Sequence, residues 1–106
     1  MHDHMIGYVS QLCHAIAAAL MIAEDNTSLA EYTGDSFRDL TRIARLNDKM
    51  WAELFLWNKE NLINQIDQFD MALQTIKKAM EDDDREKLER LFQLSTKRRA
   101  LFDKKQ

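Results

Sequence analysis

Two arginines and an aspartate lie close together near the middle of this 106-residue chain. In the stretch SFRDLTRIARL (36–46), Arg42 follows Asp39 by three residues and Arg38 by four. Side chains at these spacings are neighbours on a helix, so Asp39 can pair with Arg42. Apolar residues flank Arg42, and an arginine held partly buried there could bind a carboxylate through two parallel hydrogen bonds. Arg42 is therefore either a surface charge on an amphipathic helix or the anion-binding group of a site.

The three histidines, His2, His4 and His14, are the other candidates for chemistry. On one helix His2 and His14 would lie about 18 Å apart, at roughly 1.5 Å per residue, so they cannot share a metal ion within one chain. No glutamate or cysteine stands at a metal-ligand spacing from His14, and we expect no metal site. His14 follows Gln11 and Cys13 in an otherwise apolar segment. It is either a core histidine with one hydrogen bond or a polar group that points into a ligand pocket.

The elements that position these residues are expected to be helices. The chain has no proline, two glycines and 45% apolar residues, a composition typical of an all-α domain. Apolar residues recur at helical steps over 3–24 and surround the second half of that segment, which predicts a long, buried central helix. A loop or short helical turn is expected at 29–35, where Gly34 can adopt positive φ. Ser36 is expected to cap the helix 36–46.

The second half of the chain predicts more helices, ending in an antiparallel hairpin. Asn47 or Asp48 should cap a helix that carries Trp51 and Trp57, and packing in an aromatic core is the ordinary explanation for both tryptophans. Beyond it, apolar residues follow at intervals of 4, 3, 4, 3 and 4, at Leu62, Ile66, Phe69, Leu73, Ile76 and Met80. Such a seam requires a partner helix. The acidic run 81–84 predicts a turn and suits the start of the last helix.

Composition argues against several classes of protein. A net charge of −3 does not favour nonspecific nucleic-acid binding, which needs a basic face. Cys13 has no partner cysteine in the sequence, so no disulfide framework is expected and the cytoplasm is the default location. The apolar run 15–23 is too short to span a bilayer, and no basic segment precedes it, as a signal peptide would require. No glycine-rich phosphate loop occurs.

Three segments, taken in order, resemble the C-terminal domain of prephenate dehydrogenases. They are HDHMIGYVSQLCHAIAAAL (2–20), FRDLTRIA (37–44) and MWAELFLWN (50–58). The family shows HD with a histidine twelve residues later, an F-[RK]-D-x-T-R-I-A block, and a W…IF…N series. Two features depart from the family pattern: SHLPH is replaced by SQLCH at 10–14, and the glycine run before the phenylalanine is reduced to the single glycine of 34–36.

This resemblance implies a two-domain enzyme, of which residues 1–106 would form a single helical domain. An N-terminal Rossmann domain, absent from this sequence, would bind NAD or NADP and carry the catalytic histidine. The helical domain would form an intertwined homodimer and close the active site. The implied reaction is the oxidative decarboxylation of prephenate, or of arogenate, in tyrosine synthesis; prephenate yields 4-hydroxyphenylpyruvate. Since the chain has no dinucleotide-binding glycine motif, we expect it to bind no cofactor and to be inactive alone.

The resemblance also implies roles for individual residues. Arg42 matches the arginine that binds the ring carboxylate of prephenate, and His14 matches the histidine near its pyruvyl side chain. Trp51 and the backbone near Gly34 and Asp35 match elements that approach the site, and we expect them to come from the partner subunit. The small-molecule ligand expected for the site is prephenate or tyrosine.

A charge network is expected beside this site. Asp3 and Asp39 would surround Arg38 and Arg42, which would hold the two guanidinium groups in place.

Two readings from other classes stay open on the sequence alone. A freestanding helical, dimeric interaction module would explain the 4-3-4-3-4 seam. A small all-helical chorismate mutase would also clamp a dicarboxylate with arginines. That enzyme needs basic residues that converge from different helices, whereas the lysines and arginines here gather mostly in the C-terminal tail.

Overall fold

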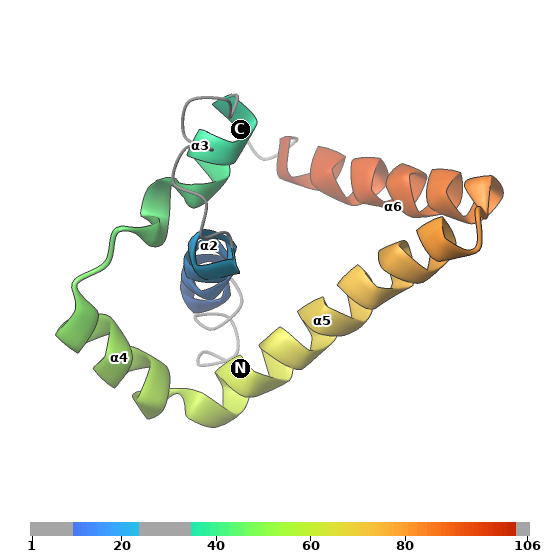
Figure 1. Ribbon diagram of the computed structural model, residues 1–106. Coiled ribbons are helices and arrows are strands. Elements are labelled where there is room, and N and C mark those ends of the chain that lie inside the picture. The colour runs from blue at the N-terminus through green and yellow to red at the C-terminus, as the bar shows by residue number, and fades with distance from the viewer. Residues whose placement is uncertain (1–9, 24–34, 104–106) are drawn as a thin grey trace. The chain divides into compact units, whose positions relative to one another are not determined.

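The computed structural model describes residues 10–23 and 35–103, and every regular element in these ranges is helical. The elements are α2 (Leu12–Ala23), α3 (Asp35–Thr41), the 3-10 turn η3 (Arg42–Ala44), α4 (Asp48–Trp57), α5 (Lys59–Glu81) and α6 (Arg85–Asp103), shown in Figure 1. The all-α fold is thereby confirmed. The chain forms two compact units that divide within α5, after Ile66, and each unit is described by itself.

In the first unit α2 packs against α3 and η3. It buries Leu12 and Ala17, whereas Ile22 near its end is 81% exposed. The predicted buried central helix is thus buried in its first part and open to solvent in its last turn. Residues 3–9 of that prediction, and the loop predicted at 29–34, lie outside the described residues.

The helix that carries the FRDLT motif differs from the prediction at both ends. It begins at Asp35, whose carboxylate interacts favourably with the positive end of the helix dipole. Ser36 therefore lies inside the helix and is not its N-cap. The α-helix ends at Thr41, whose hydroxyl donates to the carbonyl oxygen four residues earlier at 2.7 Å. After one 3-10 turn, Arg45 is extended (φ −80°, ψ 107°), so the predicted helix to residue 46 stops short.

The next helix begins as predicted. The Asn47 side chain accepts a hydrogen bond from the Met50 backbone N–H at 3.1 Å and caps α4, which satisfies a donor that has no partner within the helix. Trp57, in contrast, is 76% exposed, so the prediction of an aromatic core position for it is wrong. Asn58 ends α4 and leads directly into α5.

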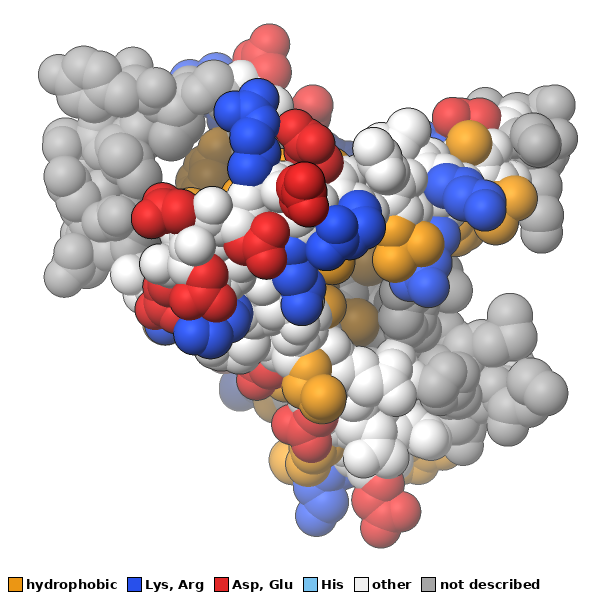
Figure 2. Space-filling view, turned by 90° about the vertical axis from the view of Figure 1, so that its right-hand side faces the viewer, with side chains coloured by type: hydrophobic (Ala, Val, Ile, Leu, Met, Phe, Trp, Pro, Cys, Tyr) orange, Lys and Arg blue, Asp and Glu red, His pale blue; other side chains and the backbone are white. Residues whose placement is uncertain are grey.

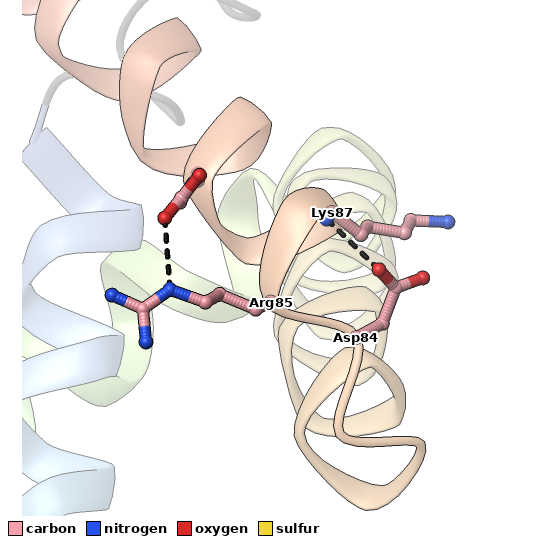
Figure 3. Close-up of polar contacts among 4 residues, drawn as sticks. Asp84, Arg85 and Lys87 are labelled. Atoms are coloured by element: carbon pink, nitrogen blue, oxygen red, sulfur yellow. Dashed lines mark hydrogen bonds and ion pairs between the residues drawn. The ribbon is translucent and has the colours of Figure 1, made fainter.

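In the second unit the acidic turn at 82–84 joins α5 to α6 and reverses the chain (Figure 1). Asp83 has φ 52°, in the left-handed region that aspartate tolerates better than most residues. The Asp84 carboxylate accepts from the Lys87 backbone N–H at 3.0 Å and caps α6 (Figure 3). Both the predicted turn and the helical hairpin are therefore present.

The surface of this hairpin is charged, but its ion pairs are exposed and weak. Ion pairs at i,i+4 join Lys78 to Asp82, Arg85 to Glu89 and Arg99 to Asp103. All six side chains are more than half exposed, and exposed pairs of this kind each contribute only about 0.3–0.5 kcal/mol. They support the individual helices without fixing how the helices pack.

The apolar seam of α5 is covered only in part. Leu62 is buried in the first unit, but Phe69, Leu73 and Met80 are 37%, 52% and 62% exposed. No described residue of α6 is buried, and Phe92 is 55% exposed. Figure 2 shows apolar side chains at the surface among the acidic and basic ones. Among the helices that the structure describes, none is both long enough and apolar enough to cross a membrane.

Candidate functional site

His14 of α2 and Trp51 of α4 lie face to face. Their ring centroids are 4.0 Å apart and the ring planes make an angle of 22°. Phe55 meets Trp51 edge to face, with centroids 6.1 Å apart and planes at 87°. Both arrangements are attractive for aromatic rings. The structure therefore brings two predicted substrate-binding residues together within one chain, whereas Trp51 was expected to approach from the partner subunit.

A second contact orients the His14 ring. Its Nδ1 lies 2.8 Å from the backbone carbonyl oxygen of Ser10. A carbonyl oxygen can only accept, so Nδ1 carries a proton and donates. In the neutral ring Nε2 then has no proton and accepts a hydrogen bond. The half-buried ring thus has the single hydrogen bond predicted for a core histidine and, among the described residues, no second one.

Arg42 lies on the surface, in the 3-10 turn η3. It lines an open hollow of about 660 Å³ together with Met21, Thr41, Ala44 and Arg45. Arg42 is therefore not partly buried in this chain, as an anion-binding arginine was expected to be, but two arginines line the hollow. Sequence reasoning missed Arg45, although its i,i+3 spacing from Arg42 is a signal for two side chains on one helix face.

The predicted ion pair between Asp39 and Arg42 does not form. The ion pairs within the described residues all belong to α5, the acidic turn and α6. The backbone leaves α-helical values at Thr41 (φ −100°, ψ 6°), so Arg42 does not continue the regular helical spacing on which the predicted pair depends. Arg42 thus carries no carboxylate partner from the described part of the chain.

Several predicted site residues lie outside the described residues. Asp3, Gly34, His2 and His4 are among them, so the charge network around Arg38 and the Gly34 contact stay predictions. Within the described ranges no three His, Cys, Asp or Glu residues are placed to hold a metal ion.

The stacked pair and the arginine hollow are related through α2. His14 lies in its first turn and Met21, which lines the hollow, lies seven residues later. Seven residues are close to two helical turns, so both side chains leave the same face of α2, about 10 Å apart along the axis.

Solved structures share this helical arrangement. Arogenate dehydrogenase from Synechocystis superposes with a TM-score of 0.85 at 20% identity, over 95% of this chain and 39% of that one. Prephenate dehydrogenase from A. aeolicus, in complex with hydroxyphenyl propionate and NAD+, superposes with a TM-score of 0.78 at 35% identity, over 94% and 37%. The fold is thus the helical portion of this class of dehydrogenase.

Sequence comparison names the family. Residues 1–94 match the family described as prephenate dehydrogenase, dimerization domain, and the chain belongs to it. Prephenate dehydrogenase from Bacillus subtilis (strain 168) is 28% identical over 86% of this chain and 26% of its own length. Cyclohexadienyl dehydrogenase from Zymomonas mobilis is 32% identical over 95% and 36%. The chain therefore spans about a quarter to two fifths of the length of these relatives.

Proposed function

We propose that this chain is the dimerisation and substrate-binding domain of a prephenate or arogenate dehydrogenase. The family match over residues 1–94 carries the proposal. Its relatives are named prephenate dehydrogenase and cyclohexadienyl dehydrogenase, and one solved prephenate dehydrogenase is in complex with hydroxyphenyl propionate and NAD+. The whole enzyme would take NAD or NADP on a separate nucleotide-binding domain, because the present sequence has no motif for it. The bound nucleotide would accept the hydride that leaves the substrate as carbon dioxide is lost.

Arg42 would bind a substrate carboxylate. Its planar guanidinium can form two parallel hydrogen bonds to that group, and no described acidic residue competes for it. Arg45 lines the same hollow and adds a second positive charge. Two guanidinium groups in one hollow attract either anionic substrate at long range.

His14 would contact the substrate side chain through Nε2. The Ser10 carbonyl holds Nδ1, and Trp51 covers one face of the ring, so the imidazole has a defined plane. Neutral Nε2 accepts a hydrogen bond, which suits the ammonium group of arogenate. Protonated Nε2 donates one, which suits the pyruvyl group of prephenate.

Dimerisation would cover the exposed apolar seam of α5 and the apolar side chains of α6. The family is named for that role, and the exposed fractions of Phe69, Leu73 and Phe92 are large for apolar residues that lie at helical spacing. In the dimer, residues of the partner subunit could complete the substrate site. A biosynthetic dehydrogenase with an exposed free thiol at Cys13 is expected in the cytoplasm.

The test is an assay of the native polypeptide that carries this chain, purified from its source. It should reduce NAD or NADP only when prephenate or arogenate is present. A polypeptide no larger than 12.5 kDa, with no turnover even when a nucleotide-binding domain is supplied, would overturn the proposal. That result would favour a freestanding interaction module, for which the exposed seam of α5 is the supporting observation.

A further inference from the structure

A buried chain of amide side chains joins the start of α2 to the junction of α4 and α5. Gln11 and Asn58 are only 3% and 6% exposed. Gln11 Nε2 donates to the Leu54 carbonyl oxygen at 3.3 Å, and Asn58 Nδ2 donates to Gln11 Oε1 at 2.9 Å. Asn61 Nδ2 in turn donates to Asn58 Oδ1 at 3.0 Å. Because the Leu54 carbonyl can only accept, it fixes the direction of every hydrogen bond in the chain.

Residues of this amide chain lie three positions away from each of the two stacked residues, close to one helical turn. Gln11 precedes His14 by three residues, and Leu54 follows Trp51 by three. Residues at this spacing share a helix face. Gln11 also follows Ser10, whose carbonyl oxygen accepts from His14 Nδ1. Hydrogen bonds of Gln11 therefore connect the turn that orients the His14 imidazole to α4, the helix that carries the Trp51 indole.

We propose that Gln11 and Asn58 are positioning residues that hold His14 against Trp51 and so aim Nε2 of His14 at the substrate side chain. Packed leucines could bury the same area, but apolar contacts are not directional. The hydrogen bonds of a buried amide pair are directional and favour one arrangement of the two segments. The step from ring position to substrate rests on the proposed function, whereas the step from amide pair to ring position does not.

The first experiment measures ring position in the full 106-residue chain. Trp57→Phe provides the background, since Trp57 is exposed and its removal leaves Trp51 as the only tryptophan. His14→Leu in that background gives the fluorescence of Trp51 without its stacked partner. Asn58→Leu should move the emission toward the His14→Leu value, and should add nothing when combined with His14→Leu. Asn64→Leu is the matched control, because Asn64 is an exposed asparagine of α5, six residues after Asn58.

The double variant Gln11→Leu/Asn58→Leu separates positioning from stability. It removes both members of the pair, so neither is left buried without the other, and its helicity should match the parent by circular dichroism. Its Trp51 emission should still differ from that of the parent. Parental emission in the double variant, or in a folded Asn58→Leu variant, would overturn the proposal.

The second experiment uses the whole dehydrogenase. A misplaced contact can cost roughly tenfold to a hundredfold in rate or affinity, so the double variant should raise KM for prephenate about tenfold and leave KM for NAD unchanged. A wild-type KM for prephenate would overturn the link from ring position to substrate. Absence of turnover in the wild-type enzyme would instead overturn the proposed function, and the fluorescence result would stand by itself.

Discussion

The two units of this molecule treat their polar and apolar side chains in opposite ways. The first unit buries Gln11, Asn58 and Gln65 beside a small set of apolar residues, and its contacts are directional. The second unit buries only Ala79 among its described residues, and its ion pairs are exposed. We infer that the geometry of the first unit is fixed within one chain, whereas the hairpin gains much of its stability from a partner.

The largest effect is expected from Leu73→Asp, in the exposed apolar seam of α5, which should weaken the dimer. Two copies would bring two carboxylates into an apolar interface, and each buried charge costs several kcal/mol. The dimer dissociation constant should rise at least about a thousandfold, which corresponds to roughly 4 kcal/mol, as measured by analytical ultracentrifugation. Met71→Asp is the control, since Met71 is 70% exposed and lies off the seam. An unchanged dimer would remove the seam from the interface.

Next in size is the effect of Arg42→Ala on the dehydrogenase. Hydrogen bonds to charged groups contribute about 1.5–3 kcal/mol, so KM for prephenate should rise roughly a hundredfold. Arg42→Lys keeps the positive charge but lacks the planar guanidinium. Its KM for prephenate should lie between the values of the wild-type enzyme and Arg42→Ala. Steady-state kinetics with Arg90→Ala, an exposed arginine of α6, provide the comparison. Equal KM values in Arg42→Ala and Arg90→Ala would exclude Arg42 from the site.

A smaller effect is expected at the turn of the hairpin. Asp84→Ala removes the cap of α6 and should lower the free energy of unfolding by about 1 kcal/mol. Asp84→Asn keeps an accepting oxygen and should change it little. Asp82→Ala, which removes only an exposed ion pair with Lys78, should cost no more than about 0.5 kcal/mol. Urea denaturation measures all three, and equal losses in Asp84→Ala and Asp82→Ala would contradict the capping role.

The smallest effect should come from Arg45→Ala. This arginine shares the hollow with Arg42 but is assigned only a long-range attraction. KM for prephenate should rise about threefold at low salt, and the difference should vanish near 1 M salt, where the Debye length is about 3 Å. The effect of Arg42→Ala should persist there. A salt-independent loss in Arg45→Ala would mean that Arg45 contacts the substrate directly.

The parts of the fold that were predicted from sequence depend on local chemistry. Asn47 caps α4 and Asp84 caps α6 because each side chain accepts a hydrogen bond from the backbone N–H three residues later. The end of the helix before Arg42 was misplaced, because the hydroxyl of Thr41 bonds back to the preceding turn, and such side-chain contacts compete with the helical pattern.

The parts that were not predicted join distant segments. Helical spacing gives no signal for the stack of His14 on Trp51, nor for the bond between Gln11 and Asn58, since each pair connects α2 or the turn before it to another helix. The exposure of Trp57 was missed for a related reason. Burial of an aromatic ring depends on what covers its helix, and the apolar pattern cannot tell whether that cover comes from the same chain.

The chain also contains a single site for thiol-specific labelling. Cys13 is the only cysteine, it is exposed, and it is the residue before His14. A thiol-reactive spin label or fluorophore therefore attaches at one defined point on the first turn of α2, with no prior removal of other cysteines. Since successive side chains on a helix point about 100° apart, the label would report on the ring of His14 from the side, and leave the face stacked on Trp51 intact.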